Sequence, residues 1–333
     1  MKTALHWRSM LKQYVQHIER FNFELVAWEM FQYQSRFNPI YKAYLDFLKI
    51  RPQDIISTHQ IPFLPISLFK DHEIVTDTWP SEAIYTSSGT TGQVTSKHFV
   101  REKDWYLENC VSGFEQHYGP IKDLCVLALL PSYLEREGSS LIDMAEHFIG
   151  ISEHEKSGFF LHNHDELAEI LKENTLQNTP TLLLGVTFAL LNFVDNQQLT
   201  LGENTIVMET GGMKGRRKEM TREAVHEILT KGFGVANIHS EYGMTELLSQ
   251  GYSKGKGIFE ITNTMRVYLR EINDPFSFHR EFRNGCLNII DLANIDSCAF
   301  LATDDLGTIH ADGTFEVKGR IDHADIRGCN LMV

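Results

Sequence analysis

A run of hydroxyl and glycine residues at positions 85–92, Tyr-Thr-Ser-Ser-Gly-Thr-Thr-Gly, has the composition of an anion-binding loop. Glycines permit tight or left-handed turns in which successive backbone N–H groups converge on one point, and hydroxyl side chains add further donors. Such a loop can surround a polyphosphate. It is not a Walker A loop, because the spacing Gly-x-x-x-x-Gly-Lys is absent. Taken alone, the run is also typical of a polar surface turn.

Four later segments carry groups that could complete a site around such an anion. Residues 211–215 contain paired glycines, which would let a planar base approach the backbone. Residues 241–246 supply a hydroxyl and a carboxylate, and residues 303–307 supply paired acids suited to sugar hydroxyls. Residues 319–322 place an arginine close to an aspartate. Each segment alone is typical of an ordinary turn, so the signal lies in their order and spacing.

Composition restricts the possible classes of function. The chain has 333 residues, 42% hydrophobic content and a formal net charge of −13. This charge argues against a general nucleic-acid or anionic-membrane binder, so a phosphate site must be local. Five scattered cysteines fit reduced thiols in a cytoplasmic protein rather than a disulfide framework. No signal peptide, integral membrane segment or zinc-ligand spacing is recognised, and oligomeric state is left open.

Periodicity predicts an α/β fold. Apolar residues at helical spacing indicate two or three helices over residues 4–50. From residue 83 onward, strands alternate with helices, which predicts a mostly parallel sheet covered on both faces, with ligands at the carboxyl ends of the strands. The expected strands are 124–130, 181–184, 205–208 and 235–238, and the expected helices lie near 104–118, 139–150, 165–174, 187–195 and 217–230.

After residue 260 the helical pattern ends, and a smaller antiparallel sheet or barrel is expected. Its strands are predicted at 265–269, 286–290, 308–310 and 315–318, with a hairpin turn at Asp312-Gly313 between the last two. We therefore divide the chain into a helical region (1–82), a nucleotide-binding α/β core (83–260), a β-rich subdomain (261–322) and a short tail (323–333).

In this order and spacing, the five segments resemble the acyl-adenylate-forming superfamily, which includes acyl-CoA ligases, luciferases and peptide-synthetase adenylation domains. Within it, the chain is most similar to the LuxE-type acyl-protein synthetases, relatives of the phenylacetate–CoA ligases. The pointers are residues 211–215, residues 130–132 and the ending Arg-Gly-Cys-Asn at 327–330. The resemblance implies the large N-terminal domain of these enzymes, with layered, mostly parallel sheets and a small antiparallel subdomain.

The resemblance also implies ATP and Mg²⁺ as cofactors and gives roles to individual residues. One group would hold the departing phosphates: Ser87, Ser88, Gly89, Thr90, Thr91 and Gly92. Another would bind the nucleoside and the metal: Gly211 and Gly212 at adenine, Tyr242 stacked on the base beside Gly243, Thr245 at the α-phosphate, Glu246 at Mg²⁺, Asp305 at the ribose hydroxyls, and Arg320 at ribose or phosphate.

The sequence departs from the family pattern in two places. Relatives continue past the Gly-Arg-x-Asp segment into a mobile lid domain with a catalytic lysine, whereas eleven residues follow Asp322 here. The lid is therefore expected to be absent. The missing cation is expected from Lys97, Lys214 or a partner chain. Lys97 lies close to the lysine of the family's loop, but the usual Pro-Lys pair is missing.

Cys329 lies near the end of the chain, after Arg327 and a glycine. A thiolate is an effective nucleophile, and a neighbouring guanidinium favours it. In LuxE-type proteins a cysteine near the C-terminus accepts the acyl group and passes it to a partner reductase, and Cys329 matches that position. The other cysteines occupy apolar contexts typical of core: Cys110, Cys125, Cys286 and Cys298.

The leading hypothesis is an acid:thiol ligase that forms an acyl-adenylate and then a thioester on Cys329. The alternatives are a truncated acyl-CoA ligase, a carrier-protein ligase, and a non-catalytic nucleotide-binding module. The acid is expected to be fatty acyl, with an aromatic acid as the alternative. Candidate walls of its pocket flank the predicted strand ends: residues 127–132, 185–188 and 239–240.

Overall fold

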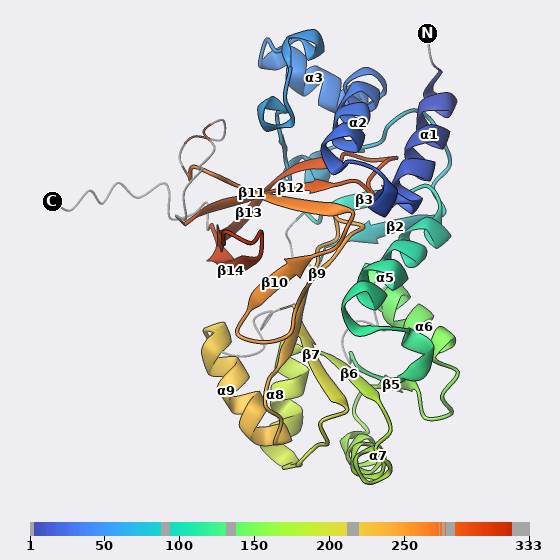
Figure 1. The fold of residues 1–333 in the computed structure, drawn as a ribbon, viewed down its shortest axis with the longest axis vertical. Coiled ribbons are helices and arrows are strands. Elements are labelled where there is room, and N and C mark those ends of the chain that lie inside the picture. Colours follow the sequence, from blue (N-terminus) through green and yellow to red (C-terminus); the bar gives the residue numbers. More distant parts are fainter. Residues whose placement is uncertain are drawn as a thin grey trace, which may run out of the picture.

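The computed structural model describes residues 3–87, 94–130, 138–211, 220–272, 274, 277 and 284–321. Three helices at the N-terminus cover one end of the molecule (Figure 1): α1 (Ala4–Gln16), α2 (Phe23–Phe37) and α3 (Pro39–Phe47). Each begins at a side-chain cap, from Thr3, Asn22 or Asn38, which accepts a backbone N–H of the first turn. Short elements then lead into the core: η1 (Ile18–Arg20), η2 (Pro52–Asp54), η3 (Thr58–Gln60), β1 (Leu64–Pro65) and α4 (Leu68–Asp71).

The expected parallel sheet is present. Its strands lie in the order β5-β4-β6-β7-β8, all parallel: β4 (Cys125–Leu129), β5 (Gly158–Phe160), β6 (Thr181–Val186), β7 (Thr205–Thr210) and β8 (His239–Tyr242). Strands β4 and β6 are buried along their whole length, as strands covered on both faces must be.

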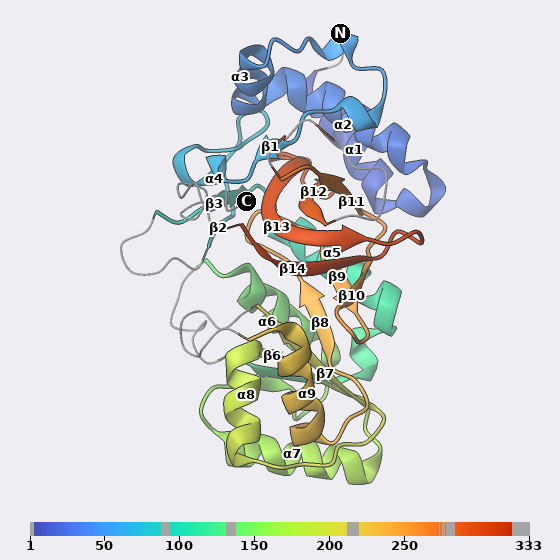
Figure 2. The same ribbon diagram turned by 90° about the vertical axis from the view of Figure 1, so that its left-hand side faces the viewer.

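Helices cover both faces of this sheet. One face packs against α5 (Lys103–Tyr118) and α6 (Ser140–Ser152), with η4 (Ile121–Asp123) between them. The other face packs against α8 (Thr187–Asn196) and α9 (Arg222–Phe233), while α7 (His164–Gln177) lies at the far end. Figures 1 and 2 show the two helical layers on opposite sides of the strands.

The prediction of a strand at 235–238 was wrong, because these residues connect α9 to β8. Gly234 ends α9 in the left-handed conformation, with φ of 63°, and the N–H of Val235 still bonds to the carbonyl of Thr230. The strand begins at His239 and includes Tyr242. Part of the 241–246 segment is therefore strand rather than loop.

An antiparallel half continues the same sheet in the order β9-β10-β14-β13-β12-β11. Its strands are β9 (Gly251–Ser253), β10 (Ile258–Ile261), β11 (Met265–Arg270), β12 (Gly285–Asp291), β13 (Phe300–Ile309) and β14 (Phe315–Arg320). The antiparallel region was predicted, but it is joined to the parallel half through β8, β9 and β10. Strand β13 is also longer than expected, so residues 303–307 lie within a strand.

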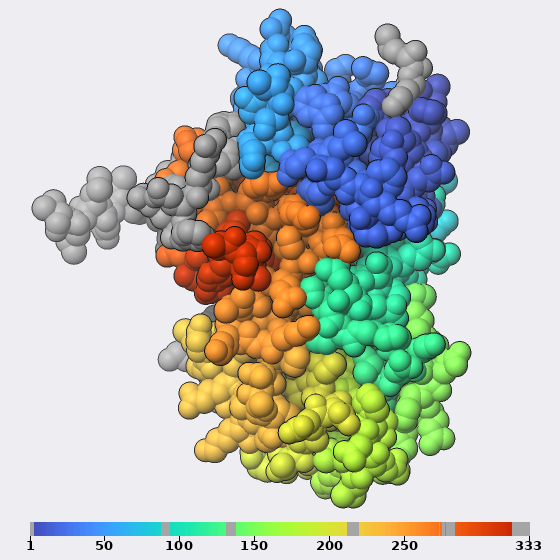
Figure 3. Space-filling model, viewed as in Figure 1, coloured from blue at the N-terminus to red at the C-terminus, as the bar shows by residue number. Residues whose placement is uncertain are grey.

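The predicted turn at Asp312-Gly313 is confirmed. The N–H of His310 bonds to the carbonyl of Thr314 at 2.8 Å, and Gly313 has φ of 86°. A separate hairpin, β2 (Ala83–Thr86) with β3 (Lys97–Val100), flanks the hydroxyl-rich run. One apolar core runs from α1 to β14, and the space-filling view shows the N-terminal helices lying directly against α5 and the later strands (Figure 3). Within the described ranges, no helix has the length and apolar character needed to cross a membrane.

Candidate active site

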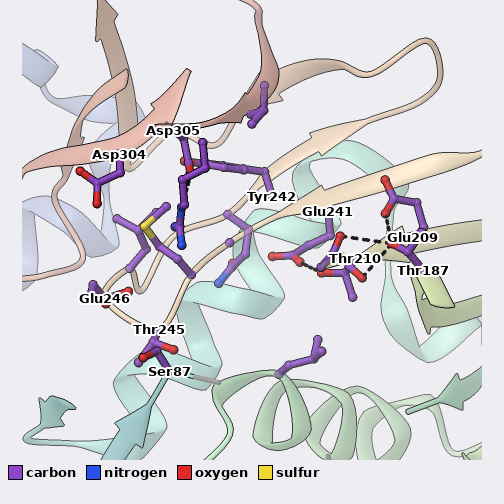
Figure 4. A pocket seen from close by; sticks show the side chains of 18 of the residues that line it. Ser87, Thr187, Glu209, Thr210, Glu241, Tyr242, Thr245, Glu246, Asp304 and Asp305 are labelled. Atoms are coloured by element: carbon purple, nitrogen blue, oxygen red, sulfur yellow. Dashed lines mark hydrogen bonds and ion pairs between the residues drawn. The ribbon is translucent and has the colours of Figure 1, made fainter. Parts of the chain in front are cut away.

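A cavity of about 1080 Å³ opens where the parallel and antiparallel halves of the sheet meet. It is lined by the ends of β7 and β8, the loop after β8, the starts of α6 and α9, the β2–β3 hairpin, and β13–β14 (Figure 4). Its volume is slightly above the usual range of about 300–1,000 Å³ for small-molecule sites. The carboxyl ends of β7 and β8 open into it, where ligands of parallel sheets bind.

Tyr242, Asp305 and Arg320 form one connected group at the wall of this cavity. The Tyr242 hydroxyl donates to Oδ2 of Asp305 at 2.8 Å, and Nε of Arg320 donates to Oδ1 at 3.0 Å. The group joins three strands: β8, β13 and β14. Asp305 keeps further lone pairs on both oxygens, so it can still accept hydroxyl groups from a ligand.

The ring of Tyr242 packs into the apolar core and also borders the cavity. It is buried against Phe259 and Phe315, with ring centroids 5.9 and 5.4 Å away, and it also lines the cavity. Burial and the neighbouring Asp305 raise the pKa of Tyr242 well above its usual value, so its hydroxyl stays protonated and donates.

The loop after β8 carries Thr245 and Glu246 into the cavity, and two side chains from distant segments hold its backbone. Nδ1 of His98, on β3, lies 2.8 Å from the carbonyl oxygen of Thr245, and Nδ2 of Asn294 donates to the carbonyl of Glu246 at 2.9 Å. His98 is buried, and burial lowers its pKa to about 4, so the ring is neutral at pH 7. A neutral ring facing a carbonyl must carry its proton on Nδ1.

Asp291, fully buried at the end of β12, anchors the far side of the same loop. Its carboxylate accepts from the N–H groups of Leu248 and Ser249, from the Ser249 hydroxyl and from the N–H of Ala293, at 2.6–3.1 Å. Neither Asp291, His98 nor Asn294 was identified from the sequence. Their role depends on contacts between residues far apart in the chain, and no local pattern signals them.

The hydroxyl-rich run lies only partly within the described residues. Ser87, at the end of β2, lines the cavity, and its Oγ accepts the N–H of Ser96 at 2.9 Å. Lys97 is exposed on β3 and is not among the residues that line the cavity. The lining cations that the structure describes come from other segments, and the sequence reading missed four of them: Lys70, Arg222, Lys256 and Lys318, beside the expected Arg320.

Gly211 and Gly243 are both brought to the cavity. Gly211 ends β7 with φ of 71°, a conformation that favours glycine, and its carbonyl accepts the Thr187 hydroxyl at 3.1 Å. At Gly243, the Cβ of any other residue would overlap Oε1 of Glu241. The remaining predicted site residues lie outside the described residues: Ser88, Gly89, Thr90, Thr91, Gly92, Gly212, Lys214 and Cys329.

Two glutamates at the strand ends differ in their surroundings. Glu209 of β7 accepts the Thr187 hydroxyl at 2.7 Å and lies 3.6 Å from both Arg222 and His226. Burial works against its charge, but these partners outweigh burial and lower the pKa of Glu209. Glu241 of β8 is bonded by Thr210, yet burial, with the nearby charge of Glu209, raises the pKa of Glu241 to about 7.

The carboxylate of Glu246 is suited to bind a divalent cation together with the phosphate oxygens of a ligand. It is 6% exposed, burial raises the pKa of its carboxyl, and no described residue forms an ion pair with it. The described residues contain no cluster of three or more metal-ligating side chains. A single carboxylate suits Mg²⁺, which is bound in nucleotide sites by one or two carboxylates together with substrate phosphates.

The candidate walls of an acid pocket are placed differently from expectation. Residues 127–130 are fully buried core and do not line the cavity, and of residues 185–188 and 239–240 only Thr187 does. Tyr106 of α5 and residues 140, 141 and 144 of α6 line the cavity. The four described cysteines are buried, in agreement with the prediction that they belong to the core: Cys110, Cys125, Cys286 and Cys298.

No family model matches this sequence, and no curated protein matches it. Solved structures do match. A 2-hydroxyisobutyryl-CoA ligase in the postadenylation state, in complex with 2-HIB-AMP, superposes with a TM-score of 0.62 at 11% identity, covering 90% of this chain and 68% of the ligase. ATP-bound MatB from Rhodopseudomonas palustris superposes with a TM-score of 0.53 at 14% identity, covering 72% of this chain and 48% of MatB.

This chain thus spans about half the length of MatB and about two thirds of the hydroxyisobutyryl-CoA ligase. At these identities the similarity concerns the fold. The expected architecture, an α/β core with a mixed sheet flanked by helices and an antiparallel region, is therefore confirmed. The chain has the fold of the N-terminal part of the acyl-adenylate-forming CoA ligases.

Proposed function

We propose that this chain activates a carboxylic acid with ATP. An oxygen of the substrate carboxylate bonds to the α-phosphorus, the bond from that phosphorus to the bridging oxygen breaks, and pyrophosphate leaves. The observation that carries the proposal is the convergence of Tyr242, Asp305 and Arg320 with Gly211 and Glu246 on one cavity, in the fold of an adenylate-forming ligase.

Each of these residues has a place in the proposed reaction. Tyr242, Gly211 and Gly212 contact the adenine. Asp305 accepts hydrogen bonds from the ribose hydroxyls. Thr245, whose backbone His98 holds, faces the α-phosphate. Ser87 and the glycine- and hydroxyl-rich residues 88–92 receive the departing pyrophosphate. Cationic side chains and N–H donors that already surround the phosphates lower the activation barrier of the reaction, because they need not reorganise as the transition state forms.

Glu246 would hold Mg²⁺, which neutralises phosphate charge when bound. Arg320 and the lining lysines Lys70 and Lys256 add positive charge around the same cavity. Lys214 remains a candidate for the cation that stabilises the transition state. Lys97 does not line the cavity, so its participation requires a different position of its side chain.

For the second step, we propose that the acyl group passes to the Cys329 thiol, which displaces AMP and forms a thioester for transfer to a partner such as an acyl-CoA-reductase-like protein. This assignment depends on the sequence resemblance around Cys329. The 2-hydroxyisobutyryl-CoA ligase, solved also in complex with 2-HIB-AMP and CoA, supports a second candidate, in which the acceptor is CoA or an acyl carrier.

Pyrophosphate release tests the first step. We expect release that requires both ATP and an acid, measured over a panel of fatty, hydroxylated, amino-substituted and aromatic acids. Nucleotide binding without release for any acid in the panel would instead indicate a nucleotide-binding module that has no ligase activity.

Intact-mass analysis tests the acceptor. A covalent acyl adduct is expected after incubation with ATP and the active acid, and Cys329→Ser should abolish the adduct while leaving pyrophosphate release. Cys110→Ser is the matched control, because Cys110 is buried in α5. Turnover with CoA by the Cys329→Ser variant would assign the acceptor to CoA.

A further inference from the structure

The side chains of β8 alternate between the two faces of the sheet. In β8, Ser240 faces α9, with its Oγ 3.3 Å from Nε2 of His226, whereas His239 faces α5, with Nδ1 3.2 Å from the Tyr118 hydroxyl. Side chains alternate along a strand, so Glu241 shares the α5 side with His239. Burial raises the pKa of Cys110 on α5, a hydrogen bond with Tyr106 opposes this, and the charge of Glu241 raises this pKa further, in agreement with a position of Glu241 near α5.

Residues of α5 and α6 also line the cavity. Tyr106, Ser140, Leu141 and Met144 line it, while Gly211, Asp305 and Arg320 line the part assigned to the nucleotide. An acid that reacts with the α-phosphate needs space next to the nucleotide, and the α5–α6 side provides it. This step rests on the proposed function.

Glu241 is a carboxyl group on this side, and one of its oxygens can accept further hydrogen bonds. Thr210 bonds to its Oε2, and no hydrogen bond to Oε1 comes from any residue that the structure describes (Figure 4). Gln250, 3% exposed, also lines the cavity, and its carbonyl Oε1 has no hydrogen-bond partner. This Gln250 oxygen is itself buried, and Nε2 of Gln250 lies 3.4 Å from Cys110 Sγ of α5, so the acceptor that a ligand can reach on this side is Oε1 of Glu241.

A plain alkyl chain would exclude water from Glu241 and supply no hydrogen bond in return, which is costly for a carboxyl group. A ligand hydroxyl or ammonium group would satisfy Oε1. We propose that the acid activated by this site carries a hydrogen-bond donor on its chain, bound by Glu241, and is not an unsubstituted fatty acid. This narrows the fatty or aromatic acids expected from the sequence to a polar class.

The test compares acids of matched length that end in methyl, hydroxyl or ammonium groups, over the butanoate, hexanoate and octanoate series. For the wild-type chain, kcat/KM for pyrophosphate release should favour a donor-bearing acid over its methyl partner by about tenfold to 100-fold. Thermal protection by the same acids in the presence of a non-hydrolysable ATP analogue gives a second readout, independent of turnover.

Two variants separate the possible donors. Glu241→Leu should reverse the preference toward methyl-ended acids. Glu241→Gln keeps the shape of the side chain and a carbonyl acceptor. If the natural donor is an ammonium group, this variant should retain activity with hydroxyl-ended acids and lose activity with ammonium-ended acids. Glu169→Gln, at an exposed position on α7 with 74% of its side chain accessible, should leave the preference unchanged.

The outcomes are distinguishable. Best activity with methyl-ended acids, unchanged by Glu241→Leu, would overturn the inference and leave the proposed function intact. Failure of every acid to release pyrophosphate would overturn both. If Glu241→Leu does not fold, as judged by its thermal transition, the selectivity of Glu241→Gln and the preference of the wild type still show whether Glu241 binds a donor on the acid.

Discussion

At the scale of single residues, Asp305 connects the site. One oxygen accepts from Tyr242 of β8 and the other from Arg320 of β14, so one carboxylate fixes two groups that would contact a nucleotide. It is 7% exposed, and the part that remains accessible faces the cavity. Removing its charge should therefore affect binding more than folding.

We expect Asp305→Asn to weaken ATP binding by about tenfold to 100-fold, because hydrogen bonds to a charged group contribute roughly 1.5–3 kcal/mol. Calorimetric titration measures the change. Asp312→Asn, in the exposed turn between β13 and β14, is the matched control and should bind ATP normally. Equal affinity in the two variants would exclude Asp305 from the nucleotide site.

Glu241 should give the stability of the chain a pH dependence. Burial raises its pKa from 4.5 to about 7, so the folded state binds a proton that the unfolded state releases over this interval. The stabilisation from this proton is complete below pH 4.5 and is lost as pH rises through 7. The unfolding temperature of the Glu241→Gln variant should therefore be higher than that of the wild type, by a difference that increases with pH. A margin that does not change with pH would show that Glu241 has an ordinary pKa.

At the scale of elements, the loop after β8 is held by three buried side chains from other segments. His98 and Asn294 hold the carbonyls of Thr245 and Glu246, and Asp291 holds the N–H groups of Leu248 and Ser249. His98 belongs to the hairpin that flanks the hydroxyl-rich run. One imidazole therefore connects the β2–β3 hairpin to the loop after β8.

His98 variants test this coupling. His98→Asn places an amide N–H near the position of Nδ1 and should retain pyrophosphate release within a few-fold. His98→Leu removes the donor and should lower kcat by about tenfold or more, the cost of a lost positioning hydrogen bond. Equal kcat for the two variants, at equal thermal stability, would mean that the hydrogen bond to Thr245 does not position the loop.

Asp291 should be a stability residue of the same loop. Asp291→Asn replaces one acceptor oxygen by an NH₂ donor, so at least one of the buried backbone N–H groups that the carboxylate accepts loses its partner. We expect a loss of about 1–3 kcal/mol in the free energy of unfolding. Denaturant titration measures it. A neutral effect would show that the loop finds other acceptors.

At the scale of the whole molecule, the sheet is one path whose parallel and antiparallel halves meet at the cavity. The sequence predicted both halves, because alternating strands and helices and a late hairpin have strong local patterns. It misplaced β8, whose residues His239–Tyr242 are polar although two of them are buried. It also did not assign residues 303–307 to a strand. In both places some polar side chains line the cavity, Glu241 and Tyr242 in β8 and Asp304 and Asp305 in β13, so the rule that buried strands are apolar fails where strands border a polar cavity.

Because both halves contribute to one apolar core and one site, they should unfold together. A nucleotide at 100 times its Kd should stabilise the folded state by about 2.7 kcal/mol and shift a single thermal transition. Calorimetry would contradict this picture if it resolved two transitions of which ATP moved only one.

The central claim is tested most directly by acid-dependent exchange of labelled pyrophosphate into ATP, which reports formation of the acyl-adenylate before any transfer. We predict exchange by the wild-type chain that requires an acid and falls steeply in Asp305→Asn. ATP binding without exchange, across hydroxylated, amino-substituted, fatty and aromatic acids, would contradict the account.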